Sequence, residues 1–173
     1  MTRIVAGTAG GRRLAVPPSG VRPTGDRARE GLFNSLGTLL DLDGAVVLDL
    51  YAGSGALGLE ALSRGAKSAD FVEFRPASLH ALRANVAALK LRERTRIFKR
   101  DAVQFAAALG AESYEIAFVD PPYESRQLDL VIAAWQEKRF ARILVAEHAR
   151  VHEIPRGGWR RAFEDTVVTI YRG

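Results

Sequence analysis

A glycine-rich loop behind a short apolar run is the feature that most constrains how this chain can fold. Residues 46–48 (Val-Val-Leu) are wholly apolar, as expected of a parallel strand buried on both faces of a sheet. Gly53, Gly55 and Gly58 then satisfy the pattern G-x-G-x-x-G. Glycines at these positions allow a tight turn and let a ligand approach the backbone beside a helix N-terminus. By itself the loop is compatible with NAD, FAD or S-adenosylmethionine, or with a tight strand-to-helix turn and no ligand.

Strand-like and helix-like segments alternate along the chain after this loop. The predicted strands are residues 46–48, 69–74, 95–98, 115–119, 142–146, 159–164 and 166–171. One predicted helix follows the glycine loop and ends near residue 64, and the others span 76–90, 102–109 and 128–137. Such alternation predicts an α/β fold with an open, doubly wound and mainly parallel sheet of seven strands. The short final connection predicts an antiparallel hairpin at the C-terminal edge.

The first 25 residues differ from this pattern and are strongly basic. Two apolar-basic stretches, 3–6 and 12–16, flank a Thr-Ala-Gly-Gly turn and predict a β-hairpin, which a proline-rich connector follows. Asp26 is then expected to cap a helix that reaches about Leu40. We therefore divide the chain into a basic hairpin with its connector, residues 1–25, and a main domain with a leading helix, residues 26–173.

Charge placement suggests a partner for this N-terminal segment. Six of the first 30 residues are arginines and only two are acidic, within a chain of net charge +5. Arginine is suited to bidentate phosphate contacts and to stacking on bases, so the segment is expected to bind a nucleic acid. The alternative is a genome-wide bias towards Arg and Ala, which the Ala-rich sequence allows.

Composition excludes several other classes of protein. The 173 residues include no cysteine, which excludes a disulfide scaffold and Cys-based zinc or redox sites. The three histidines are scattered, so no metal site is expected. No apolar run approaches the ~18 residues of a membrane span, and no secretory signal is evident. We therefore expect a soluble, cytoplasmic domain.

Acidic residues close three successive predicted strands. Asp49, Glu73 and Asp101 stand at or just after the ends of the first, second and third core strands. A carboxylate at the mouth of the glycine loop would repel a pyrophosphate, but it suits the sulfonium and ammonium groups of S-adenosylmethionine. Glu73 can accept hydrogen bonds from ribose hydroxyls, and Asp101 can accept one from an adenine amino group. The three acids together favour S-adenosylmethionine over a dinucleotide.

The fourth core strand leads into Asp120, Pro121, Pro122 and Tyr123. The prolines make the backbone rigid and remove two N–H donors, so the segment offers mainly acceptors. Acceptors directed at an amino group stabilise the positive charge that develops on its nitrogen during methylation, and a tyrosine ring can hold a base by stacking. The alternative is a proline-rich strand terminator without a role in catalysis.

Residues 120–123 resemble the [N/D]-P-P-[Y/F/W] signature of amino-methyltransferases on a class I S-adenosylmethionine fold. The N-terminal half resembles the bacterial RsmD family, which methylates the exocyclic amine of one guanosine in small-subunit (16S) ribosomal RNA. This similarity runs to about Glu147 and rests on residues 3–7, 11–14, 22–24, 26–30, 32–34 and 48–61. The last ~25 residues fit less well, because Phe-Glu-Asp-Thr stands at 163–166 where the family often has Tyr-Gly.

The resemblance implies a role for each motif. The cofactor-binding residues would be Asp49, Tyr51, Ala52, Gly53, Gly55, Gly58, Glu73, Asp101 and Ala102, with Ala102 near the adenine. Residues that address the target base would be Asp120, Pro121, Pro122 and Tyr123. RNA contacts would come from the basic residues Arg12, Arg13, Arg22, Arg27 and Arg29. The implied partner is 16S rRNA, free or within an assembling or complete small subunit, and the expected enzyme is a monomer without a metal.

An argument from hydrogen bonding bears on the base. Guanine presents two adjacent donors, N1–H and the amino group, and an acceptor-only carboxylate such as Asp120 can face both. Adenine presents a donor beside an acceptor and would suit Asn better. A DNA amino-methyltransferase shares the chemistry but usually needs a larger recognition domain. A nicotinamide-dependent oxidoreductase would explain only the glycines, and a non-catalytic RNA-binding module would explain only the arginines.

Overall fold

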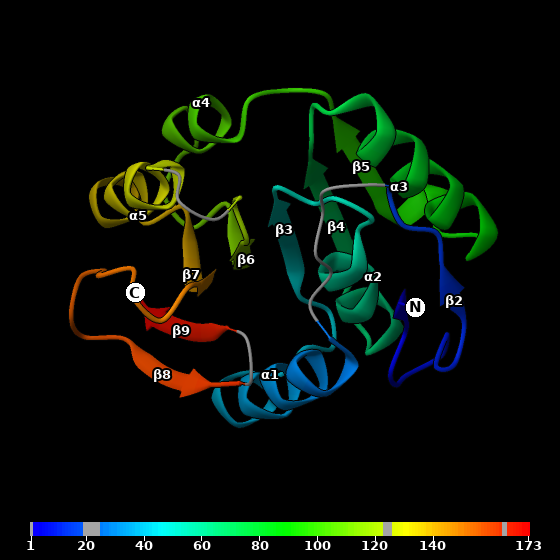
Figure 1. The fold of residues 1–173 in the computed structure, drawn as a ribbon, viewed down its shortest axis with the longest axis horizontal. Helices are drawn as coiled ribbons and strands as arrows, with labels where there is room; N and C mark the ends of the chain where they lie inside the picture. The colour runs from blue at the N-terminus through cyan, green and yellow to red at the C-terminus, as the bar shows by residue number, and fades with distance from the viewer. Residues whose placement is uncertain (1, 19–24, 123–125, 164–165) are drawn as a thin grey trace.

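A seven-stranded sheet forms the centre of the molecule (Figure 1). The computed structural model describes residues 2–18, 25–122, 126–163 and 166–173. In spatial order the strands are β5 (Thr95–Phe98), β4 (Ser68–Val72), β3 (Val46–Leu50), β6 (Tyr114–Val119), β7 (Ala141–His148), β9 (Val167–Arg172) and β8 (Trp159–Ala162). The first five are parallel, whereas β9 is antiparallel to both β7 and β8. The parallel sheet and its antiparallel C-terminal edge confirm the prediction.

Helices cover both faces of the sheet. They are α1 (Asp26–Leu39), α2 (Ala56–Ser63), α3 (Pro76–Ala88), α4 (Ala102–Ala107) and α5 (Gln127–Lys138), with a 3-10 turn at Arg92–Arg94. Figure 1 shows α4 and α5 on one face and α1, α2 and α3 on the other. Strand residues alternate between the two cores: Val47 faces α1–α3, for example, and Leu48 faces α4 and α5. The described helices include none long and apolar enough to cross a membrane.

Most element boundaries lie within two residues of those predicted, and one capping residue is wrong. Gly25, not Asp26, is the N-cap of α1, and it makes no side-chain capping bond. Asp26 instead lies in the first turn, where its carboxylate accepts hydrogen bonds from Arg3 Nε at 3.0 Å and Arg29 Nη2 at 2.9 Å. Two guanidinium partners replace the helix N–H groups that a capping aspartate would bind.

The predicted N-terminal hairpin is present, with strands shorter than expected. Its paired strands are only β1 (Thr2–Arg3) and β2 (Arg13–Leu14). The hairpin does not project into solvent, because Ile4 and Leu14 are buried in the core beneath α1 and α2. Its turn binds the end of α2, where Thr8 N donates to the Ser63 carbonyl at 2.8 Å. The division at residue 25 therefore separates two segments that share one core.

The carboxylate of Glu60 on α2 joins the N-terminal hairpin and α1 to α2. It is fully buried and accepts hydrogen bonds from Val5 N (2.8 Å), Ala6 N (3.1 Å), Arg29 Nε (3.2 Å) and Arg64 Nε (2.9 Å). Arg29 is also fully buried and donates to the Arg3 carbonyl. Buried charges are tolerated only when paired and hydrogen-bonded, and here both partners satisfy that condition.

Replacing Glu60 by Ala should lower the free energy of unfolding by about 3–5 kcal/mol, because the buried Arg29 would lose its buried ion-pair partner and keep the partly exposed Asp26 in its place. Urea unfolding followed by circular dichroism measures this. The matched control is Glu93→Ala, an exposed residue of the 3-10 turn, for which a change within about 0.5 kcal/mol is expected. Equal stability of the two variants would contradict the role given to Glu60.

Candidate functional site at the carboxyl edge of the sheet

Five adjacent parallel strands each end in, or are soon followed by, a carboxylate. In the order β5, β4, β3, β6, β7 these are Asp101, Glu73, Asp49, Asp120 and Glu147. Because the carboxyl ends of parallel strands meet at one edge of a sheet, side chains from distant parts of the sequence gather there. Pairing of Val119 with Ala146 places Asp120 and Glu147 directly after neighbouring residues of β6 and β7. We call these five residues the acidic row.

Asp49 is the most deeply buried member of the acidic row, at 1% exposure. Its Oδ2 accepts a hydrogen bond from Gly58 N, in the first turn of α2, at 3.0 Å. A Cβ at position 58 would lie 2.5 Å from the Phe71 ring and 3.2 Å from this Oδ2, so the close approach requires glycine. Burial, with a smaller contribution from the charge of Glu73, raises the pKa of Asp49 from 3.8 to about 8.

The glycine loop is held against Glu73. Glu73 Oε1 accepts from Gly53 N at 2.9 Å, and Oε2 accepts from Phe74 N at 2.9 Å. Gly55, the N-cap of α2, has a φ of +85°, and a Cβ there would lie 2.5 Å from Leu82 Cδ1. Ser54 and Ala52 are buried in the same turn. The predicted loop therefore connects the end of β3 to α2 in a shape that only glycine permits at position 55.

Tyr51 departs from ordinary geometry at the mouth of this loop. Its φ is +58°, a left-handed conformation that costs a non-glycine residue about 1–2 kcal/mol. Among the described residues, its buried hydroxyl has no hydrogen-bond partner. Burial and the nearby charge of Asp101 raise the pKa of this hydroxyl. A strained residue with an unsatisfied polar atom beside the acidic row is what a binding site for a polar ligand provides.

Asp101 lies at the outer end of the row. It is the N-cap of α4, and its Oδ2 accepts from Gln104 N at 3.0 Å. The residue is exposed, and Ala102, which follows it, is buried in the first turn of α4. The side chain thus has a structural role, and the position predicted for an adenine contact remains accessible.

Asp120 and the following prolines lie at the centre of the edge. Burial and the charges of Glu147 and Asp49 raise the pKa of Asp120 well above its ordinary value. Pro121 is buried and Pro122 is exposed. Tyr123, the fourth residue of the predicted motif, lies outside the described residues. The structure therefore brings three carboxylates together around the position predicted for the reacting amine.

The basic residues predicted to contact RNA divide into two groups. Arg12, Arg13 and Arg27 are exposed, and Arg12 Nη2 also donates to the Ala88 carbonyl at 3.1 Å. Arg22 lies outside the described residues. The expectation that Arg29 contacts RNA is wrong, because its side chain is fully buried in ion pairs with Asp26 and Glu60. The number of arginines in the sequence does not indicate which of them forms an ion pair with a buried carboxylate such as Glu60.

Two further side chains lie at this edge and were not among the site residues predicted from the sequence. Glu147 extends the acidic row to β7 and is 8% exposed. Phe74 follows Glu73 and is 55% exposed, which makes its ring a candidate for stacking on a flat ligand. A repeated signal, an acid at the end of every parallel strand, could have identified Glu147. An aromatic residue directly after such an acid could have identified Phe74.

The row is chemically suited to a cationic ligand. Without one, the close carboxylates repel each other and two of them are protonated more readily than usual. A ligand with positive charge near Asp49 would restore the ionised forms. No group of three or more side chains that could hold a metal ion is found within the described part of the chain.

Comparison with known proteins identifies the family of this chain. A family model described as "Conserved hypothetical protein 95" matches residues 2–166. The chain is 46% identical over 131 residues to ribosomal RNA small subunit methyltransferase D of Escherichia coli K12, an alignment that covers 75% of this chain and 64% of that protein. The chain belongs to the RsmD family.

Other relatives extend the alignment over more of the chain. YlbH of Bacillus subtilis, provisionally named an rRNA methyltransferase, is 35% identical over 159 residues, which are 88% of this chain and 85% of that protein. The solved structure of yhhF from E. coli, provisionally named a methyltransferase, has a TM-score of 0.83 and 34% identity over 99% of this chain and 97% of that one. The RsmD-family chain thus has the class I S-adenosylmethionine methyltransferase fold, as predicted.

The raised pKa of Asp49 predicts how stability depends on pH. The folded protein holds the Asp49 proton more tightly than the unfolded chain, so the free energy of unfolding falls as pH rises from about 3.8 to about 8. Asp49→Asn removes this titrating group. The free energy of unfolding of the ligand-free variant, relative to that of the parent, should therefore be higher at pH 8 than at pH 5. Urea unfolding at both values measures the difference.

The matched control for this experiment is Asp43→Asn, an exposed carboxylate close to the opposite end of β3. It should follow the pH dependence of the parent chain. An Asp49→Asn variant that loses stability with pH as steeply as the parent would show that the Asp49 carboxyl is not the buried titrating group.

Proposed function

We propose that this chain transfers a methyl group from S-adenosylmethionine to the exocyclic 2-amino group of a guanosine in 16S ribosomal RNA. The observation that carries the proposal is the acidic row, in which Asp120-Pro121-Pro122 is adjacent to the carboxylates of a cation site. Membership of the RsmD family supports the same chemistry.

Each part of the edge has a role in this proposal. When bound, S-adenosylmethionine supplies an electrophilic methyl group on a positively charged sulfur. Asp49 would hold its charged end, Glu73 its ribose hydroxyls, and Asp101 with Ala102 its adenine. Backbone groups of Ala52, Gly53 and Gly55 in the glycine loop would contact the cofactor between its charged end and its ribose. The Tyr51 hydroxyl would gain a hydrogen-bond partner. Phe74 would stack on the adenine.

The target base would meet a different set of groups. Asp120 and the carbonyls before the two prolines accept hydrogen bonds from the amino group, which stabilises the positive charge that develops on nitrogen. Tyr123 supplies a stacking surface. As the nitrogen–carbon bond forms, the sulfur–carbon bond breaks and sulfur keeps the electron pair. The methylated nitrogen then loses a proton to water. Burial and the charges of Glu147 and Asp49 raise the pKa of Asp120, and a cation bound beside these carboxylates would favour its ionised acceptor form.

Guanine is favoured over adenine because an ionised Asp120 faces two adjacent donors, N1–H and the amino group. Methylation of a DNA base is the alternative that shares this chemistry, and no relative or structural feature favours it. The small N-terminal hairpin leaves no room in the described chain for a large recognition domain.

The RNA would lie across the N-terminal segment. We assign residues 1–25 to an RNA-binding appendage and residues 26–173 to the methyltransferase domain. Arg12 and Arg13 supply exposed positive charge there, with Arg22 in the connector, and Arg27 adds an exposed charge at the start of α1. The substrate is 16S rRNA, free or within an assembling or complete small subunit, and the enzyme acts as a cytoplasmic monomer.

The central test is transfer of a labelled methyl group to 16S rRNA and to small subunits from a strain that lacks this enzyme. Asp120→Asn should lower kcat by about 10²–10³-fold while S-adenosylmethionine still binds, because the variant removes an acceptor aimed at the transition state. Mapping the modified nucleotide identifies the guanosine.

The matched control is Asp43→Asn, which should leave turnover unchanged. Calorimetric titration should show binding of S-adenosylmethionine and none of NAD. Label incorporated into duplex DNA and into neither RNA substrate would overturn the proposed function. Full turnover by Asp120→Asn would overturn the role of that residue.

The basic segment gives a separate prediction. Replacing Arg12, Arg13 and Arg22 by Gln should weaken RNA binding and reduce the slope of log K against log salt by up to about 2, since each phosphate contact with single-stranded RNA contributes roughly 0.7. Filter binding across a range of salt concentrations measures the slope. Affinity for S-adenosylmethionine should stay unchanged. An unaltered slope would show that these arginines do not contact phosphates.

A further inference from the structure

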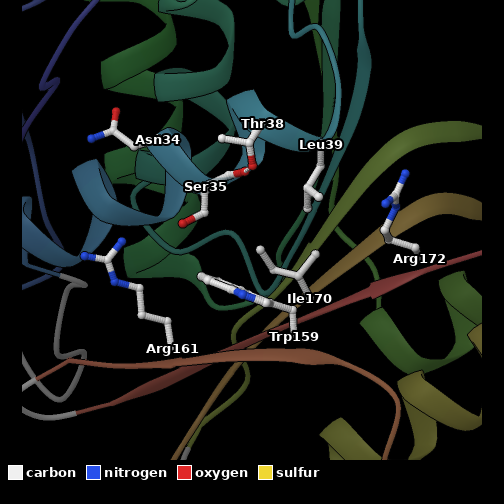
Figure 2. Close-up of a pocket in the computed structure, with 8 residues that line it drawn as sticks. All are labelled: Asn34, Ser35, Thr38, Leu39, Trp159, Arg161, Ile170 and Arg172. Carbon is white, nitrogen blue, oxygen red and sulfur yellow. Dashed lines mark hydrogen bonds between the residues drawn. The ribbon is translucent and has the colours of Figure 1, made fainter.

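A groove between α1 and the β8–β9 hairpin lies outside the site described above. It encloses a cavity of about 530 Å³, large enough for a small ligand or one flipped-out nucleotide. Figure 2 shows the Trp159 ring facing α1, with Arg161 at one end of the groove and Arg172 at the other. The opposite wall is formed by α1 and consists of three polar residues, Asn34, Ser35 and Thr38, and the apolar Leu39.

Trp159 has the surroundings of a stacking platform rather than of a core residue. Its side chain is 48% exposed, although the strand that carries it is fixed to β9 by the pairing of Trp159 with Ile170. Arg161 stands two residues further along β8, so both side chains lie on the face that α1 covers. A large ring held on a rigid strand and left open to solvent can bind a flat partner at little cost in conformational entropy.

The charges of the groove select an anionic partner. Arg161 and Arg172 form no ion pair with any described carboxylate, and the described residues that line the cavity include no acid. Arg172 also borders a neighbouring cavity that contains Asp41, Glu112 and Glu115, so Arg161 is the cation that belongs to this groove alone. The Arg161 guanidinium lies 5.2 Å from the centre of the Phe163 ring, which orients it without neutralising its charge. Guanidinium groups on both sides of an open indole suit a nucleotide, whose phosphates flank a flat base.

Polar side chains on the α1 wall can form hydrogen bonds with the edge of such a base. Ser35 Oγ donates to the Gly31 carbonyl at 3.0 Å, and Thr38 Oγ1 donates to the Ser35 carbonyl at 2.7 Å. Both hydroxyl protons point to the helix backbone, so the oxygens can act as acceptors. The exposed amide of Asn34 offers both donors and an acceptor.

The groove also lies within reach of the reacting edge. Strand register places Val119, Ala146, Thr169 and Arg160 in one row across the sheet. Three spacings of about 4.8 Å put Arg160 roughly 14 Å from the end of β6, where Asp120 begins. An RNA strand with its target base at Asp120 could therefore pass along the groove.

We propose that this groove binds an unpaired nucleotide of the substrate RNA, with its base stacked on Trp159 and its phosphates bound by Arg161 and Arg172. The proposal rests on the proposed function, since the RNA is the methylation substrate. It adds a second RNA contact, on the side of the active edge opposite the N-terminal hairpin. The target base is then held between two points of attachment.

Trp159→Ala should weaken binding of protein-free 16S rRNA by roughly 5- to 100-fold, the range found when a single base-stacking aromatic is removed. The loss should appear in KM for RNA, with kcat and the affinity for S-adenosylmethionine unchanged. Trp159→Tyr keeps a stacking ring and should restore most of the affinity. The matched control is Leu130→Ala, a 53% exposed apolar residue on α5, for which no change is expected.

A second measurement does not depend on turnover. The chain has two tryptophans, and the other, Trp135, is buried with its indole N–H bound to the Ala141 carbonyl at 2.7 Å. Stacking of a base on Trp159 should quench the intrinsic fluorescence when 16S rRNA is added, and Trp159→Phe should abolish this quenching. Thermal unfolding of each variant shows whether it is folded.

Trp159→Ala with parental RNA affinity, or quenching that persists in Trp159→Phe, would overturn the proposal. If Trp159→Ala loses affinity for assembled small subunits but keeps its affinity for protein-free 16S rRNA, the proposal is also overturned, because the groove would then bind a ribosomal protein. If the parent chain methylates no RNA yet shows Trp159-dependent quenching by 16S rRNA, the proposed function fails, and the groove is an RNA-binding site without a methylation substrate.

Discussion

The site depends on the parallel direction of β5, β4, β3, β6 and β7, because this alone brings their carboxyl ends to one edge. Each of these strands contributes one acid, and the five lie far apart in the sequence. Burial and mutual repulsion raise the pKa of Asp49 and of Asp120, so the ligand-free site is electrostatically unfavourable. A cationic cofactor bound at this edge would relieve the repulsion, so that the electrostatic free energy lost in the empty site would be regained on binding.

A second buried cluster sets the shape around that edge. Glu60 accepts hydrogen bonds from the N-terminal hairpin and from Arg29 of α1, so both segments are fixed to α2. Through α2 they are also fixed to the glycine loop, which ends where this helix begins. The hairpin that would meet the RNA, the helix that forms one wall of the groove, and the glycine loop are therefore all connected through α2. A small domain can hold a large substrate in register only if its contact surfaces are rigid relative to one another.

Opposite charges then lie on different parts of one small molecule. Exposed arginines occur on the hairpin, at the start of α1 and on the C-terminal β8–β9 hairpin, whereas the carboxylates lie between these regions at the sheet edge. An anionic polymer would be attracted to the flanks, and a cationic cofactor to the centre. In this arrangement a bound polymer would approach the acidic row without competing with a cationic ligand there. The net charge of +5 hides this separation.

The sequence by itself determined the α/β class, nearly all elements, the glycine turn and four of the five strand-end acids, because periodicity, glycine and acid position are local signals. Only the tertiary structure decided which charges are buried. Arg29 reads as one more exposed arginine until Glu60, 31 residues away, is seen beside it. Likewise, Trp159 reads as one aromatic among arginines until α1 forms the other wall of its groove. Burial and pairing depend on contacts between distant segments, which no local pattern encodes.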